Sequence, residues 1–168
     1  MLKVFLVEDE VVMRNGIKNN IPWEQEGFEF AGEASDGELA YPLIKKEKPD
    51  ILITDIRMPF MDGLELSRLV KKELPQIKII ILSGYNEFDY AKTAINIGVT
   101  DYLLKPISSA KLLEAVKKVA DMIEKEQDNA RLIKRYEKEM EENILQEKHK
   151  LWGALASNRL STIELLEK

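Results

Sequence analysis

The sequence predicts an α/β protein with a doubly wound, five-stranded parallel sheet in the order 2-1-3-4-5, flavodoxin-like, followed by a C-terminal helical extension. Two observations predict this fold class. Five short apolar runs, typical of strands, alternate with five stretches that carry apolar residues at helical spacing. The runs at 51–53 and 77–82 are almost purely aliphatic, as expected of parallel strands covered on both faces.

The first two strand–helix units occupy residues 2–47. A strand at 2–7 runs into acidic residues, and the helix that follows is closed by Pro22 and Trp23. At 28–34, apolar or small residues alternate with polar ones, which predicts a strand near the sheet edge. The buried helix faces are expected at Met13, Ile17 and Ile21 in the first helix, and at Leu39, Ala40, Leu43 and Ile44 in the second.

Three further units complete the sheet. The strand that begins with the apolar run 51–53 ends on Asp55, and a Pro/Gly turn follows it. The next strands are expected at 77–82 and 100–104. Helices are expected at 64–74, where Asp62 caps the start, at 88–98, and from Ser108 or Ser109 onward. Their inward residues are Leu66, Leu69 and Val70, then Phe88, Ala91, Ala94 and Ile95, then Leu112, Ala115, Val116 and Val119.

The chain is expected to divide into a domain at 1–122 and a helical linker at 123–168. Apolar residues along this last helix alternate at spacings of three and four, with glutamates at the missing steps, which favours a weak coiled coil; a single solvated helix is the alternative. The series is Val116, Val119, Ile123, Ala130, Ile133, Met140, Ile144 and Leu151, interrupted by Glu126, Glu137 and Glu147. Residues 151–168 are expected to form one or two short amphipathic helices.

Composition limits the chemistry. The chain contains no cysteine and one histidine, His149, so any metal must be a hard cation held by oxygen. The net charge of −5 is concentrated in residues 1–104, at −6, which disfavours nucleic-acid binding by this chain alone. No apolar run approaches the ~18 residues of a membrane span, and the N-terminus does not look like a secretory signal. A cytoplasmic protein without membrane contact is therefore expected.

Five polar residues follow the ends of the predicted strands: Glu8, Asp9, Asp55, Ser83 and Lys105. Parallel topology brings these ends to one edge of the sheet. Three carboxylates together would repel, and Mg²⁺, which prefers oxygen ligands and is commonly shared with phosphate, would relieve that repulsion. With Lys105 and Ser83 facing an anion, Asp55 is the candidate nucleophile for phosphoryl transfer, whereas Glu8 and Asp9 are placed to hold the metal.

At these residues the sequence resembles the receiver domain of two-component response regulators. The resemblance covers residues 1 to about 122 and includes the acidic pair at 8–9, the Asp-Ile-Arg-Met-Pro-Phe-Met-Asp-Gly run from Asp55, Ser83-Gly84, Tyr102 and Lys105-Pro106. The Ile21-Pro22-Trp23 insertion and the run from Ser83 to Ala91 further resemble regulators whose receiver precedes an AraC-type DNA-binding domain. No such output domain follows within residues 123–168, so DNA contact is expected only through a further domain.

The resemblance implies a signalling switch rather than an enzyme, one that assists its own phosphoryl transfer and dephosphorylation. Asp55 would accept phosphate from a sensor histidine kinase. Mg²⁺ would be held by Asp9, Asp55 and the backbone carbonyl of Arg57, with Glu8 acting largely through water. Ser83 and Tyr102 would move on phosphorylation, and Lys105-Pro106 would be a cis peptide. A homodimer is expected through the face of helix 88–98, strand 100–104 and the last helix, or through the C-terminal part of that helix.

Two alternatives differ in class. A phosphorylation-independent dimerisation or scaffold module would carry the acidic edge as a remnant. A phosphatase of the haloacid-dehalogenase type would need an acid/base aspartate two residues after the nucleophile, where this chain has Arg57. A further hypothesis concerns Tyr85, whose bulk would hinder hydrolysis of the acyl phosphate.

Overall fold

The computed structural model describes the backbone of residues 1–84 and 88–167, and the side chains of residues 1–84 and 89–156. The chain divides into two compact units, Met1–Met122 and Ile123–Lys168. Tyr85 therefore lies outside the described residues, and so does the side chain of Phe88. None of the described helices combines the length and apolar content that a membrane span requires.

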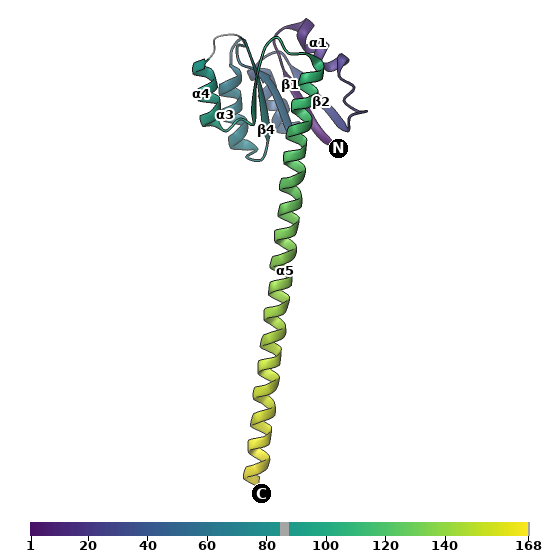
Figure 1. Ribbon diagram of the computed structural model, residues 1–168. Coiled ribbons are helices and arrows are strands. Elements are labelled where there is room, and N and C mark those ends of the chain that lie inside the picture. Colours follow the sequence, from purple (N-terminus) through teal and green to yellow (C-terminus); the bar gives the residue numbers. More distant parts are fainter. Residues whose placement is uncertain (85–87, 168) are drawn as a thin grey trace. The chain divides into compact units, whose positions relative to one another are not determined.

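The first unit contains a five-stranded parallel sheet with the order β2-β1-β3-β4-β5, which confirms the predicted fold class (Figure 1). All four neighbouring strand pairs are parallel. The strands are β1 (Leu2–Val7), β2 (Phe28–Ala34), β3 (Ile51–Asp55), β4 (Lys78–Ser83) and β5 (Asp101–Leu104). Every residue of β3 is buried, as its central place in the sheet requires.

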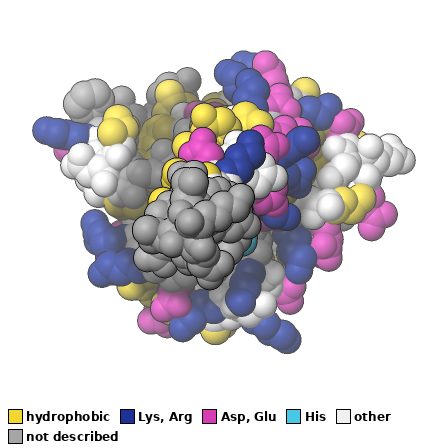
Figure 2. Space-filling view, turned by 90° about the horizontal axis from the view of Figure 1, so that it is seen from below, with side chains coloured by type: hydrophobic (Ala, Val, Ile, Leu, Met, Phe, Trp, Pro, Cys, Tyr) yellow, Lys and Arg dark blue, Asp and Glu magenta, His cyan; other side chains and the backbone are white. Residues whose placement is uncertain are grey.

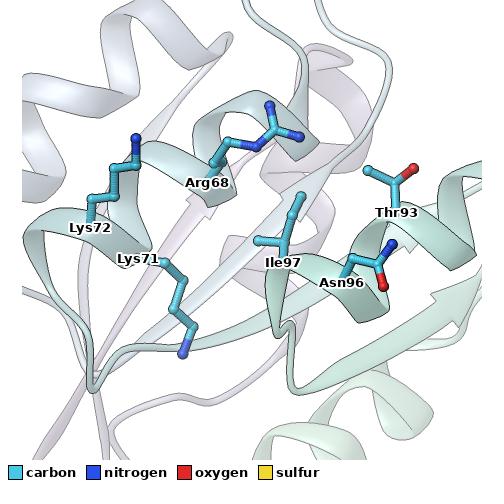
Figure 3. A pocket seen from close by; sticks show the side chains of 6 residues that line it. All are labelled: Arg68, Lys71, Lys72, Thr93, Asn96 and Ile97. Atoms are coloured by element: carbon cyan, nitrogen blue, oxygen red, sulfur yellow. The ribbon is translucent and has the colours of Figure 1, made fainter.

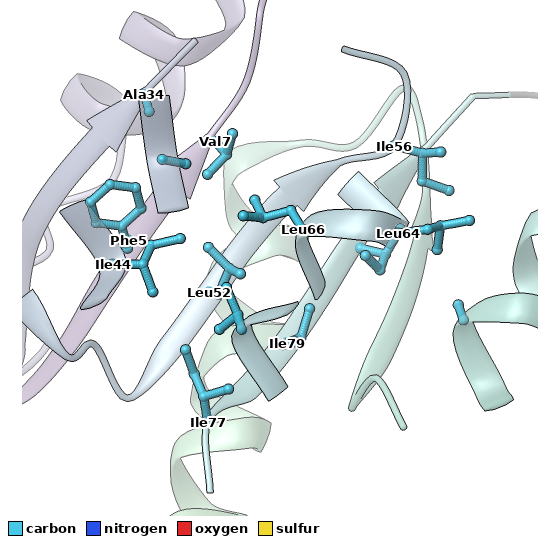
Figure 4. Packing of buried hydrophobic residues seen from close by; sticks show 14 residues of the cluster. Phe5, Val7, Ala34, Ile44, Leu52, Ile56, Leu64, Leu66, Ile77 and Ile79 are labelled. Atoms are coloured by element: carbon cyan, nitrogen blue, oxygen red, sulfur yellow. The ribbon is translucent and has the colours of Figure 1, made fainter. Parts of the chain in front are cut away.

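The helices alternate with the strands: α1 (Val11–Asn20), α2 (Gly37–Glu47), α3 (Gly63–Glu73), α4 (Phe88–Ile97) and α5 (Ser109–Glu167). One hydrophobic core joins one sheet face to α2, α3 and α4, with Phe5, Leu52 and Ile79 meeting Ile44 and Leu66 (Figure 4). Because side chains alternate along a strand, the neighbours of these strand residues point to the opposite face, which is left to α1 and the first turns of α5.

Strand β2 does not keep the predicted alternation. Val4 pairs with Phe30 but Phe5 pairs with Gly32, so Ala31 forms a bulge in the register. One extra residue reverses which side of the sheet the following side chains face, and Phe28 and Ala34 are therefore buried on different faces. Glycine at position 32 leaves room for the Phe5 ring, because a Cβ there would lie 2.7 Å from a ring carbon and the ring would have to shift.

Three predicted inward residues are exposed: Leu39 at 56%, Leu43 at 42% and Ile95 at 75%. In α2 the buried residues are Ala40 and Ile44, so this amphipathic helix presents a narrower stripe to the core than the sequence pattern indicated. In α4 only Ala94 is fully buried among the described side chains. The sequence pattern therefore predicted wider buried helix faces than the structure has, because exposed apolar residues also occur at helical spacing.

Helix α5 corrects the expectation for the C-terminus. Residues 151–167 continue the same helix and do not form separate short helices. Its start follows the prediction, because the Ser108 hydroxyl accepts a hydrogen bond from the Lys111 backbone N–H at 3.2 Å. Within the described part of the second unit, the apolar side chains from Leu132 to Leu155 are about half exposed or more.

Candidate functional site

Asp55 lies at the carboxyl end of the central strand β3 and is only 8% exposed. Its two carboxylate oxygens have different partners. The Ile56 backbone N–H donates to Oδ1 at 2.8 Å, and the Lys105 ammonium donates to Oδ2 at 2.8 Å. The carboxylate is therefore held in orientation by a backbone N–H on one side and by the Lys105 ammonium on the other.

Glu8 and Asp9 follow β1 and lie beside Asp55. Glu8 is fully buried whereas Asp9 is exposed, and the three residues offer carboxylate oxygens that lie within 4.8 Å of one another. An all-oxygen set of three acids is the kind of site that Mg²⁺ occupies, and no softer ligand is present among them. The residues therefore fit the cation that the sequence predicted.

Lys105 connects the predicted site residues across the sheet. It follows β5, and its ammonium reaches Glu8 at 3.2 Å to Oε1 and 3.3 Å to Oε2, in addition to Asp55. Its backbone N–H donates to the Ser83 carbonyl at 2.6 Å, which ties it to the end of β4. The Lys105–Pro106 peptide bond is cis. The contact between Lys105 and Glu8 was not predicted from the sequence.

The electrostatics of this cluster are dominated by Glu8. Burial raises the pKa of the Glu8 carboxyl to about 7, and the nearby charge of Asp55 adds to the rise while Lys105 opposes it. Burial alone would lower the pKa of the Lys105 ammonium, but its hydrogen bonds and charge interactions with Asp55 and Glu8 leave that pKa raised. One lysine therefore does not fully compensate two buried carboxylates, and a divalent cation would complete the balance.

The loop after Asp55 contains a residue that sequence analysis missed. Gly63, at the start of α3, packs directly on the Asp55 carbonyl oxygen, so that a Cβ at this position would overlap it. Its N–H donates to the Ile56 carbonyl at 2.7 Å. Asp62 caps α3, as predicted, through the Glu65 N–H at 2.8 Å. The Asp-Gly dipeptide was the available signal, but a turn explained it equally well.

Arg14 is a second missed residue. Its guanidinium donates to the Glu8 carbonyl at 2.7 Å and so ties the first helix to the strand end that carries the acids. A lone arginine in an amphipathic helix gives no such signal in the sequence, because nothing there shows which carbonyl it reaches.

The remaining predicted residues lie nearby with different exposures. Ser83 is fully buried at the end of β4, and its hydroxyl donates to the Gly84 carbonyl at 3.3 Å. Tyr102, on β5, is half-buried and packs against the hydrophobic core. Arg57 is exposed, with its guanidinium carbon 6.0 Å from the centre of the Tyr90 ring.

A separate groove of about 420 Å³ lies between α3 and α4. Arg68, Lys71 and Lys72 line one side of it, and Thr93 and Asn96 line the other (Figure 3). Arg68 already pairs with Glu65 at 2.7 Å, and the Lys71 ammonium donates to the Ile77 carbonyl at 2.7 Å. None of these groove residues belongs to the Asp55 cluster.

Comparison with known proteins assigns the family. Residues 4–117 match the response regulator receiver domain, and the chain belongs to this family. It is a receiver domain of two-component systems, a class of signalling switches.

Several of the similar proteins are named as regulators of transcription. The chain is 40% identical over 119 residues to the uncharacterised transcriptional regulatory protein YesN of Bacillus subtilis. This aligned region covers 71% of this chain and 32% of YesN. The REC domain of AraT, a response regulator from Geobacillus stearothermophilus, is 42% identical with a TM-score of 0.71, over 75% of this chain and 98% of that one. A two-component transcriptional regulator AraC from Clostridium phytofermentans gives 32% identity and a TM-score of 0.67, over 77% and 99%. The chain thus spans about a third of the length of YesN.

Proposed function

We propose that Asp55 accepts a phosphoryl group from the phosphohistidine of a sensor histidine kinase and that the domain changes conformation in response. The observation that carries this proposal is the pair of contacts on the Asp55 carboxylate, from the Ile56 N–H and the Lys105 ammonium. They orient a buried nucleophile at the carboxyl edge of the sheet, where open α/β sheets place their chemistry.

The proposed step is a direct displacement at phosphorus. An Asp55 carboxylate oxygen forms a bond to phosphorus as the phosphorus–nitrogen bond of the kinase histidine breaks, and the imidazole leaves with the electron pair and takes up a proton. Lys105 passes its hydrogen bond from Asp55 Oδ2 to a phosphoryl oxygen. Because Lys105 remains bound to Glu8, this shift needs only a small movement of the ammonium.

Mg²⁺, when bound, neutralises negative charge on the carboxylates and on the transferred phosphoryl group. We assign its binding to Asp9, Asp55 and the backbone carbonyl of Arg57, with Glu8 contributing largely through water. The close approach of the three carboxylates and the raised pKa of Glu8 support this assignment, since both indicate excess negative charge.

The conformational response is assigned to Ser83 and Tyr102. The phosphoryl group draws the Ser83 hydroxyl away from the Gly84 carbonyl, to which it donates in this structure. Tyr102, at the edge of the core, turns into the space that is released. Only the contacts that differ between the two states can shift this equilibrium, and those are the contacts of the phosphoryl group with Ser83 and Lys105.

The output is proposed to be transcription, exerted through a DNA-binding domain outside residues 1–168, in a cytoplasmic regulator that acts as a homodimer. Residues 1–122 form the receiver and 123–168 the helical linker. The dimer forms through the α4–β5–α5 face or through the C-terminal part of α5. Basic and acidic side chains are interspersed on the described surface in Figure 2, which gives no extended basic patch for nucleic acid in that view.

The test is phosphorylation with acetyl phosphate and Mg²⁺, followed by intact-protein mass spectrometry. The native chain is expected to gain one phosphoryl group and Asp55→Asn none. Asp62→Asn is the matched control, because this exposed cap residue keeps its capping ability as asparagine and should be labelled like the native chain. A full mass gain in Asp55→Asn would contradict the proposal.

A further inference from the structure

Four apolar side chains of α5 form a seam at spacings of seven, four and seven residues. Their exposed fractions are 57% for Ile133, 49% for Met140, 50% for Ile144 and 63% for Leu151. Spacings built from threes and fours generate the contact line of a coiled coil, in which each seam residue is covered by a partner helix with the same repeat. A second copy of this chain carries that repeat by definition.

A parallel, in-register pair is disfavoured by the seam itself. Glu126, Glu137 and Glu147 occupy the seam positions between the apolar residues. In a parallel pair each glutamate would face its own counterpart across the symmetry axis, which gives like charges at three layers.

An antiparallel pair removes all three of these contacts. The seam consists of alternating a and d positions of the heptad, and in an antiparallel pair each a position faces a d position of the partner. When Ile133 faces the partner's Ile144, this register sets each of the three seam glutamates against an uncharged residue. The resulting layers are Ile133 with the partner's Ile144, Glu137 with the partner's Met140, Glu147 with the partner's Ala130 and Glu126 with the partner's Leu151.

Charges beside the seam select the same register. Lys134 and Glu141 flank the seam on one side, and this antiparallel register pairs Lys134 with the partner's Glu141 twice by symmetry. Shifting the pair by one heptad in one direction brings Lys134 against the partner's Lys134. Shifting it in the other direction brings Lys134 against the partner's Lys148. The charge pattern therefore distinguishes this register from both of its neighbours.

Ion pairs within the helix use other residues. Arg131 lies 3.8 Å from Asp128, and Arg135 lies 3.7 Å from Glu139, all on the side of the helix away from the seam. Among the described contacts of the single chain, Lys134 and Glu141 form no ion pair. They are exposed and remain available for a partner helix.

We propose that α5 associates with a second copy of the chain as an antiparallel coiled coil, with Ile133 against the partner's Ile144 and Lys134 against the partner's Glu141. This inference rests on the homodimer proposed above and chooses the C-terminal helix over the α4–β5–α5 face. It does not depend on Asp55, so the Asp55→Asn protein should dimerise like the native chain.

Sedimentation equilibrium of the full chain tests the interface. Ile144→Asp is expected to weaken association by about 100-fold or more, because a charge replaces a buried side chain in both copies. The matched control is Leu145→Asp, since Leu145 is 55% exposed but lies outside the seam, and it should leave the dissociation constant unchanged. Ile95→Asp on α4 should also leave it unchanged, which separates this interface from the alternative face.

Two further experiments test orientation and register. Lys134→Glu should weaken the dimer about tenfold by setting like charges together, and adding Glu141→Lys should restore it. Because the chain has no cysteine, engineered thiols report unambiguously. A chain carrying Ile133→Cys and Ile144→Cys should form intermolecular disulfides on mild oxidation, and Ile144→Cys alone should form none.

Several results would overturn the proposal. A native chain that is monomeric at all concentrations would do so, as would equal weakening by Ile144→Asp and Leu145→Asp. Rapid disulfide formation by Ile144→Cys alone would show a parallel pair. Cross-linking of a Met140→Cys, Leu151→Cys chain without cross-linking of the 133/144 chain would show a different register. None of these outcomes would bear on phosphorylation of Asp55.

Discussion

Glu8→Gln should stabilise the magnesium-free protein, and by more at high pH than at low pH. The pKa of Glu8 is raised from an ordinary 4.5 to about 7 in the folded protein. Stability from the protonated carboxyl is fully present below pH 4.5 and is lost as the pH rises through about 7. The full loss is about 3 kcal/mol, because each tenfold change in proton affinity is worth about 1.4 kcal/mol. Glutamine removes this cost and keeps an oxygen that accepts from Lys105.

The assay is urea unfolding in the presence of a chelator at pH 5 and pH 8. The free energy of unfolding of Glu8→Gln should exceed that of the native chain by about 1 kcal/mol at pH 5 and by about 3 kcal/mol at pH 8. The exposed neighbour Glu10 provides the control substitution, Glu10→Gln. Saturating Mg²⁺ should restore the stability that the native chain loses at pH 8. An advantage of Glu8→Gln that is the same at both pH values, or a variant less stable than the native chain at pH 8, would refute this account of the cluster.

Three other predictions follow from the contacts of individual residues. Gly63→Ala should lose about 3 kcal/mol or more in urea unfolding, because its Cβ meets the Asp55 carbonyl, whereas Gly153→Ala, whose Cβ meets nothing within 4 Å, should not destabilise the protein. Asp36→Ala should cost about 1 kcal/mol through loss of the cap on the Leu39 N–H, and Asp36→Asn should cost little. Lys105→Met should destabilise the magnesium-free protein by about 3 kcal/mol at pH 8, because Glu8 and Asp55 would be left without their cation. Adding Mg²⁺ should restore the lost stability. A loss that Mg²⁺ does not reverse would contradict this explanation.

The sheet and the convergence of the site residues could be predicted because they follow from simple rules. Aliphatic runs such as Ile79 to Leu82 have only one stable location in an α/β protein, between two layers of helix. Once the strands are parallel, topology brings Asp55, Glu8 and Lys105 to the same edge without any knowledge of side-chain positions.

What could not be predicted depends on single-residue offsets. The bulge at Ala31 reverses the facing of Ala34. Gly32 is the available signal, because an isolated glycine in a strand indicates either a bulge or a close approach, but it does not tell the two apart. Glu8 and Asp9 are adjacent acids, yet only the first is buried, because alternation at the strand end directs one inward and the next outward. Leu39 and Ile95 continue apolar stripes but find no core to cover them.

The chemistry of Asp55 is the central claim, and reductive trapping tests it most directly. Borohydride cleaves an acyl phosphate and converts the modified aspartate into homoserine, which marks the phosphorylated position covalently. The chain is treated with acetyl phosphate and Mg²⁺, reduced, digested and mapped by peptide mass spectrometry. Homoserine is expected at position 55 and at no other acidic residue. Homoserine at Glu8, Asp9 or Asp62 instead, or phosphorylation that borohydride cannot trap, would contradict the assignment of Asp55 as the phosphoryl acceptor.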